Sequence, residues 1–151
     1  MWITSIDPGT TESAILIWGG EEKRVCGPLI ASNEAILKGI RKGLWTENYV
    51  CEMIASYGMP VGKEVFETVL WIGRFMEAAE LRGGTFELVT RQQVKIHHCM
   101  SNKAKDSNVS QALKDKYGQV GSKNKPGPLY GIKSHLWSAL AVATYWSETH
   151  K

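Results

Sequence analysis

The sequence predicts an α/β fold built on a mixed five-stranded sheet. Three short apolar runs, at residues 2–7, 13–18 and 24–30, follow one another closely. Two later runs, at 49–54 and 85–89, are separated by segments with helical periodicity. Closely spaced strands favour antiparallel pairing, whereas strands joined through helices favour parallel pairing. Three antiparallel strands followed by parallel ones are therefore expected.

The first half of the chain supplies the turn and helix signals between these strands. Gly19-Gly20 is typical of a hairpin turn between the second and third strands. A helix is expected over about 33–43, with Ser32 or Asn33 as its N-cap. The clearest helix is expected over about 61–81, where apolar residues recur every three or four positions. Its stripe consists of Val61, Val65, Val69, Ile72, Met76 and Ala79. Leu70, Trp71 and Phe75 lie beyond this stripe, so the helix has apolar surface to spare for a symmetric dimer interface.

The second half predicts shorter helices. Thr90 is a suitable cap for a short helix, and residues 107–117 resemble another helix that ends at Gly118. Residues 119–128 have the composition of a mobile basic loop. A last helix is expected over about 132–148. It would direct Leu136, Leu140, Val142 and Ala143 toward a core.

Length and composition indicate an ordinary globular protein. The 151 residues, 43% hydrophobic and 22% charged, are expected to form a single domain over 1–151. No apolar stretch approaches the roughly 20 residues that span a bilayer, and no signal-peptide pattern opens the chain. The three cysteines lack paired spacing and are expected to be free thiols in a reducing compartment. We therefore expect a cytoplasmic protein without a membrane association.

Positive charge is concentrated in one part of the chain. The first 90 residues hold 8 basic and 12 acidic side chains, whereas residues 91–133 hold 9 and 2. Such a segment favours a phosphate-rich partner through direct pairing and counterion release. A solvated basic face is the simpler alternative.

Two carboxylates stand where burial would favour hydrocarbon. Asp7 ends the first strand and precedes the turn Pro8-Gly9-Thr10-Thr11, which brings its charge to the rim of a sheet where a metal or phosphate can bind. Capping of that turn is the alternative role. Glu52 lies inside the fourth strand and needs a partner, most simply a cation.

These elements follow the order of the RNase H-like fold, and three segments carry a family resemblance. Residues 6–11, residues 51–54 (Cys-Glu-Met-Ile) and residues 135–143 (His-Leu-Trp-Ser-Ala-Leu-Ala-Val-Ala) resemble RuvC-type Holliday junction resolvases, particularly small phage-encoded relatives. The resemblance implies a homodimeric endonuclease that nicks branched DNA such as a four-way junction. It also implies Mg²⁺, or Mn²⁺ as a substitute, and a site of action in a bacterial or phage-infected cell.

The resemblance assigns the metal ligands residue by residue. Asp7 matches the first-strand acid, Glu52 the fourth-strand acid and His135 the Asp or His of the last helix. Family members commonly carry a further Asp one turn after that position, and this chain has Ser138 there. Either Asp106 supplies the missing charge, or the site works with the other three residues. Asp106 as a helix cap, and His135 paired with a neighbour, are the structural alternatives.

Paired divalent ions and these side chains suit phosphodiester hydrolysis. The imidazole of His135 either holds an ion or orients and deprotonates the attacking water. His97, His98 and Cys99 are rejected as a zinc site, because adjacent helical residues point about 100 degrees apart and no second ligand pair lies at the usual spacing.

DNA contacts are expected from the basic segment. Phosphate contacts are assigned to Lys95, Lys103, Lys105, Lys123 and Lys125. Tyr57 either wedges against an unstacked base or packs within its own loop.

Two other functions remain as alternatives. A catalytically silent module that binds branched nucleic acid would explain Ser138 and the basic segment. Asp-x-Gly-Thr-Thr also resembles the phosphate loop of actin and Hsp70-type ATPases, but the chain has room for only one such domain and no second phosphate loop.

Overall fold

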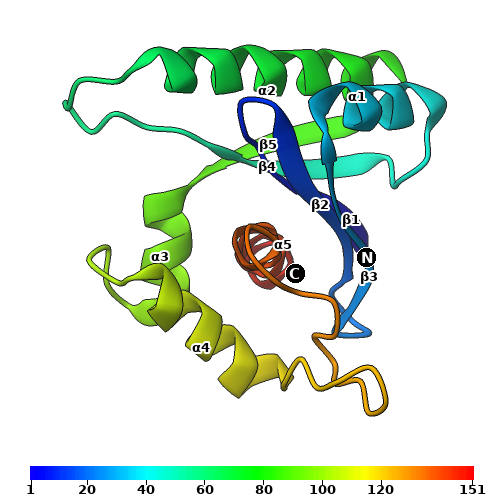
Figure 1. The fold of residues 1–151 in the computed structure, drawn as a ribbon, viewed down its shortest axis with the longest axis vertical. Coiled ribbons are helices and arrows are strands. Elements are labelled where there is room, and N and C mark those ends of the chain that lie inside the picture. The colour runs from blue at the N-terminus through cyan, green and yellow to red at the C-terminus, as the bar shows by residue number, and fades with distance from the viewer.

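The computed structural model describes all residues, Met1 to Lys151, and contains a five-stranded sheet in the order β3-β2-β1-β4-β5 (Figure 1). The strands are β1 (Trp2–Asp7), β2 (Glu12–Gly19), β3 (Arg24–Ser32), β4 (Asn48–Met53) and β5 (Thr85–Thr90). β2 pairs antiparallel with β1 and β3, whereas β4 pairs parallel with β1 and β5. The predicted mixed sheet is confirmed.

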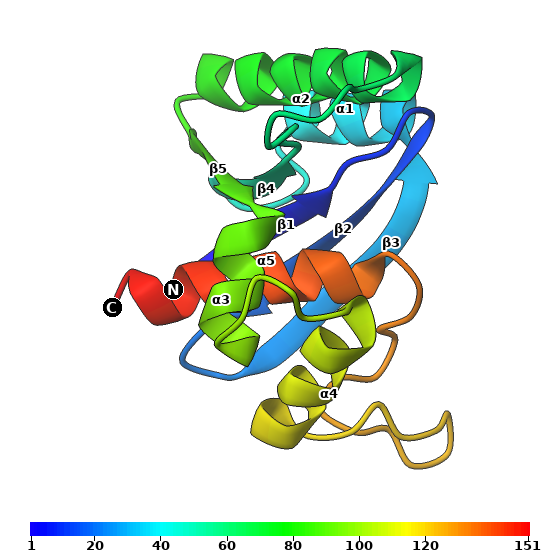
Figure 2. The ribbon, with the colours of Figure 1, turned by 90° about the vertical axis from the view of Figure 1, so that its left-hand side faces the viewer.

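Helices cover both faces of this sheet. α1 (Asn33–Lys42) and α2 (Lys63–Leu81) lie on one face, and α5 (Leu136–Thr149) lies across the other (Figures 1 and 2). α3 (Arg91–Cys99) and α4 (Asp106–Tyr117) pack beside α5. No helix is both long and apolar enough to cross a membrane.

Alternation along the strands divides the core into two layers. Ile3 and Leu16 face α5, where they join the fully buried Leu140. Ile6 and Ile15 face the opposite layer and pack with Phe75 of α2. This period of two places every second residue of β1 and β4 on the α5 side of the sheet.

Local signals define several element ends. The Ser32 hydroxyl accepts a hydrogen bond from the Ala35 amide, so Ser32 rather than Asn33 caps α1. Thr90 caps α3 as predicted and forms a reciprocal capping box with Gln93. The hairpin turn extends beyond the predicted Gly19-Gly20 pair, because β3 begins only at Arg24.

The buried stripe of α2 is rotated from the predicted one. The helix begins at Lys63, and its buried residues are Thr68, Ile72, Phe75, Ala78 and Ala79. Phe75 is a core residue with no exposed surface, so its assignment to a spare apolar face is wrong. Phe75 packs in the core layer with Ile36 and Ile40 of α1, whereas the predicted Val65 and Val69 are only half-buried.

The last helix starts later than predicted. Residues before Leu136 form consecutive turns instead of helix, with Gly131 at φ 93° and Ser134 at φ 52°. Positive φ angles are incompatible with a right-handed helix, so α5 cannot begin before Ser134. Within the basic loop at 119–128, the backbones of Ser122 and Lys125 exchange hydrogen bonds and close a tight turn.

Candidate metal and phosphodiester site

Asp7 and Glu52 lie side by side at the carboxyl ends of two parallel strands. Ile6 pairs with Cys51 in the register of β1 and β4, so the next residue on each strand is an acid. The Ser5 hydroxyl donates to the Ala139 carbonyl of α5, which shows that odd-numbered residues of β1 face that helix. Asp7 therefore projects to the α5 side, as Glu52 does through its alternation with Val50. Their exposed fractions are only 6% and 9%.

A buried polar network holds the turn after Asp7. The Ser13 hydroxyl donates to Asn33 Oδ1 at 2.6 Å and accepts from the Gly9 amide at 3.1 Å. Asn33 Nδ2 donates to the Gly9 carbonyl at 2.9 Å, and Asn33 itself is fully buried. These contacts satisfy the buried polar groups and fix where β1 ends. The turn therefore has a structural framework of its own and does not depend on Asp7 as a cap.

The two carboxyl groups perturb each other. Burial is the largest cause that raises the pKa of Asp7 to about 8, followed by the charge of Glu52 and a hydrogen bond between the two carboxyls. The nearby Arg91 acts in the opposite direction. Desolvation and these two acids also raise the pKa of the buried Cys51 thiol. Without added positive charge, this edge of the sheet disfavours two ionised carboxylates.

Arg91 and Asp106 extend the acidic pair into a chain of contacts. Arg91, the first residue of α3, donates from Nε to Glu52 Oε1 at 3.1 Å. Its Nη1 lies 3.5 Å from Asp106 Oδ1. Asp106 begins α4, but Lys105 occupies the N-cap position. The carboxylate of Asp106 thus points to Arg91 and does not cap the helix.

His135 completes the arrangement from the other side. It lies just before α5, and its Nδ1 is 3.2 Å from Asp7 Oδ2. Its side chain is 75% exposed, so it stands at the opening of the site. Ser138, one turn later on α5, lines a cavity together with His135. The structure therefore places a hydroxyl where an additional acid would be expected.

A cavity of about 410 Å³ connects these groups. Glu52, Arg91, Lys95, Asp106 and His135 line it. Asp7 and His135 line an adjacent cavity of about 200 Å³ beside the Pro8–Thr11 turn. His135 therefore borders both spaces. The site therefore combines carboxylate oxygens with one guanidinium, one ammonium and one imidazole.

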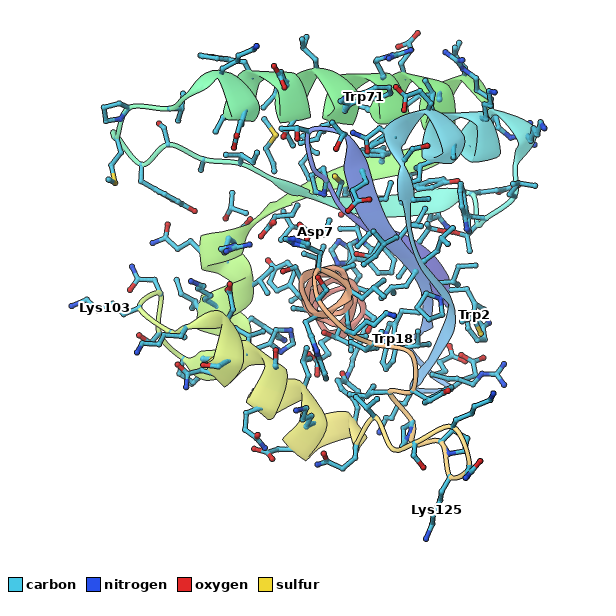
Figure 3. All side chains as sticks on the ribbon, in the orientation of Figure 1. Trp2, Asp7, Trp18, Trp71, Lys103 and Lys125 are labelled. Atoms are coloured by element: carbon cyan, nitrogen blue, oxygen red, sulfur yellow. The ribbon has the colours of Figure 1, made fainter.

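The remaining residues of the predicted set lie further out. Lys103 and Lys105 lie in the segment between α3 and α4, and Lys123 and Lys125 lie in the turn near residues 119–128. Figure 3 shows Asp7 between the sheet and α5, whereas Lys103 and Lys125 point away from the body of the protein. Tyr57 is 59% exposed in the loop after β4.

Sequence reasoning missed Arg91 as a site residue. It was one of nine cations in a basic segment, and nothing in that count distinguishes it. Its position directly after the fifth strand was the available signal, because the carboxyl ends of parallel strands meet at one sheet edge.

The two adjacent histidines, His97 and His98, lie close to Glu148 and do not form a cluster with Cys99. Glu148 of α5 joins His97 and His98, and the ligand atoms of these three lie within 4.8 Å of one another. Glu148 is already engaged, however. It contacts His97 Nε2 at 2.8 Å, accepts from the Tyr117 hydroxyl at 3.0 Å and pairs with Lys116. We interpret the cluster as a polar connection among α3, α4 and α5. The three cysteines are free thiols, as predicted.

Comparisons with known proteins agree with this architecture. No protein-family model matches the sequence, and a search of curated proteins finds no match. Among solved structures, Thermus thermophilus RuvC superposes with a TM-score of 0.73 at 18% identity, covering 99% of this chain and 97% of that one. T. thermophilus RuvC in complex with a Holliday junction substrate gives 0.69 at 18% identity, covering 96% and 92%. The chain therefore has the fold of RuvC over nearly its whole length.

Proposed function

We propose that residues 1–151 form one nuclease domain that nicks branched DNA, acting as a Holliday junction resolvase in the cytoplasm. The observation that carries this proposal is the adjacency of Asp7 and Glu52, two buried carboxyls that follow the paired residues Ile6 and Cys51 at the same sheet edge. The likeness of the fold to a RuvC that is solved with a Holliday junction substrate supports the choice of DNA.

The donor set fits a hard divalent cation. Carboxylate oxygens are the ligands that Mg²⁺ and Mn²⁺ prefer, and a cation held by these acids would reduce the repulsion that, together with burial, raises the pKa of Asp7. Asp7 and Glu52 would hold the ions, with Asp106 and His135 as further ligands. When bound, the ions would neutralise charge on the phosphoryl oxygens and promote attack by water.

The protein's own side chains then assist hydrolysis of the phosphodiester bond. A water oxygen forms a bond to phosphorus while the bond from phosphorus to the 3′ oxygen breaks. The electron pair of that bond leaves on the 3′ oxygen, which takes up a proton, and the products are a 5′-phosphate and a 3′-hydroxyl. The exposed imidazole of His135 is placed to accept a proton from the water or to act as a ligand.

DNA binding is assigned to the outlying lysines. Lys95 lines the cavity, whereas Lys103, Lys105, Lys123 and Lys125 lie outside its lining on exposed segments. Lysines in such positions neutralise backbone phosphates and orient a duplex without reading its sequence. We assign Tyr57 the role of a wedge, because its ring is exposed on a loop that leaves the Glu52 strand.

A homodimer is the proposed assembly. Phe66, Leu70 and Leu81 of α2 are 61%, 69% and 78% exposed, and they lie on the side of the helix that faces away from the sheet. A four-way junction has two strands to cut, and a symmetric pair of sites suits that substrate.

Cleavage of a labelled four-way junction tests the proposal. We expect paired nicks with Mg²⁺ or Mn²⁺ and none in EDTA. Glu52→Gln should bind the junction normally but cut it more slowly by at least about 10²-fold. The substitution removes the negative charge of a carboxylate that would hold a divalent ion at the reacting phosphate. Glu22→Gln, at an exposed hairpin position, is the matched control. Binding without any cleavage by the wild-type protein would favour the silent DNA-binding module instead, which Ser138 also suits.

A further inference from the structure

The backbone of Arg91, directly after β5, lies at the same sheet edge as the acidic pair. β5 runs parallel to β4 with Val89 opposite Glu52, so Arg91 comes two residues beyond the position opposite Glu52. The capping box of Thr90 and Gln93 holds the first turn of α3. The origin of the Arg91 side chain is therefore rigid relative to Glu52.

The local helix does not explain a cation at this position. The first turn of a helix carries the positive end of its dipole, which disfavours arginine. Tertiary contacts with two carboxylates offset this unfavourable interaction. Nε donates to Glu52 Oε1 at 3.1 Å, and Nη1 lies 3.5 Å from Asp106 Oδ1. No other lysine or arginine pairs with Asp7, Glu52 or Asp106.

The guanidinium has donors left over. It carries five N–H groups, of which one donates a hydrogen bond to Glu52 while Nη1 lies beside Asp106. Its side chain is 47% exposed, whereas that of Glu52 is 12% exposed. The outer part of the guanidinium therefore faces the 410 Å³ cavity, which Lys95 and His135 also line. A planar guanidinium can donate two parallel hydrogen bonds to a phosphate group entering that space.

Arg91 also occupies an atom that the proposed function requires. Glu52 Oε1 accepts from Arg91 Nε, yet this carboxylate is the one expected to hold a divalent ion. A guanidinium and a divalent cation compete for the same oxygen. Binding of the ion would release Arg91 within reach of the substrate.

We propose that Arg91 exchanges partners during the reaction. It pairs with Glu52 and Asp106 in the free protein, and it moves to the non-bridging oxygens of the scissile phosphodiester when divalent ions and DNA enter. There it stabilises the charge that builds on those oxygens while water bonds to phosphorus and the electron pair leaves on the 3′ oxygen. This inference rests on the proposed nuclease function and makes Arg91 a catalytic residue.

The first measurement needs no DNA. Mn²⁺ binding to the free protein is followed by calorimetry for the wild type, Arg91→Ala, Arg91→Lys and the control Arg24→Ala. Removing the competing guanidinium should tighten Mn²⁺ binding of Arg91→Ala by about 2- to 5-fold, the scale of a partly exposed ion pair. Arg24 lies at the start of β3 over the Trp2 ring, so its removal should leave the affinity unchanged.

The second measurement is single-turnover cleavage of a four-way junction at saturating Mn²⁺. Arg91→Ala should cut about 10²-fold more slowly than the wild type, although its metal sites are full. Arg91→Lys should recover part of this loss, because it restores the charge without the paired donors. Junction affinity in Ca²⁺ should change by less than the rate does.

The combination of tighter metal binding and slower cleavage distinguishes partner exchange from a structural role. Arg91→Ala that binds Mn²⁺ no more tightly, or that cuts at the wild-type rate, overturns the exchange and leaves the nuclease proposal intact. A wild-type protein that cuts no junction in any divalent metal overturns the nuclease proposal, and the exchange with it.

Discussion

Replacing Asp7 by asparagine should stabilise the metal-free protein, even though it should abolish the proposed activity. Burial and the charge of Glu52 raise the pKa of Asp7 from 3.8 to about 8. The folded protein therefore binds a proton on Asp7 that the unfolded chain has already lost between about pH 4 and pH 8. Its free energy of unfolding falls as pH rises through this window. Asparagine does not titrate, so the variant avoids this loss.

The size of the effect follows from the same shift in pKa. Each pKa unit corresponds to about 1.4 kcal/mol, so the change from 3.8 to about 8 sets an upper limit of about 6 kcal/mol at alkaline pH. Asparagine also replaces the anion that contacts His135 at 3.2 Å, which reduces the gain. We expect Asp7→Asn to be about 2–4 kcal/mol more stable at pH 8, and to melt about 5–15 °C higher.

Thermal unfolding in EDTA at several pH values tests this. The difference between the variant and the wild type should grow from near zero at pH 4 to its full size at pH 8. Adding Mg²⁺ should then stabilise only the wild type, by about 2.7 kcal/mol at 100 times the dissociation constant. An equal or lower melting temperature for Asp7→Asn at pH 8 would refute the reasoning, as would a difference that does not depend on pH.

Three further changes probe the framework and the DNA contacts. Leu140→Ala removes a fully buried side chain from the centre of α5, and urea unfolding should show a loss of about 2–5 kcal/mol. Gly9→Ala would place a Cβ 2.3 Å from a backbone oxygen, so the turn must move, and the same measurement should show a loss of about 1–3 kcal/mol. Changing Lys123 and Lys125 together to alanine should weaken junction binding and reduce the magnitude of its logarithmic salt slope by about 2; an unchanged slope removes that turn from the contact surface. The matched control changes two exposed lysines of α1, Lys38 and Lys42.

Sequence patterns predicted the sheet well because their signals are local. Strand runs, the hairpin glycines and the caps at Ser32 and Thr90 each depend on near neighbours in the chain. The rotated face of α2 was not predictable in the same way. Val65, Val69 and Phe75 are all apolar, and only packing against α1 and the sheet decides which of them are buried. The late start of α5 depends on the left-handed conformation of Ser134, for which serine gives no signal.

In the candidate site, too, the residues identified from local sequence differ from those that only tertiary contacts reveal. Asp7 and Glu52 were identifiable because an acid within an apolar strand conflicts with burial. The pairing of Glu52 with Arg91 was not identifiable, because it joins residues 39 positions apart through the parallel register of β4 and β5. Glu148 escaped notice for the same reason. It lies 51 positions from His97 and has an unremarkable sequence context.

Anomalous diffraction from a crystal soaked in Mn²⁺ tests the central claim most directly. We predict a Mn²⁺ peak between the carboxylates of Asp7 and Glu52, with Arg91 displaced from Glu52 Oε1. An absence of Mn²⁺ at these two acids, with the ion found only beside His97, His98 and Glu148, would contradict the account.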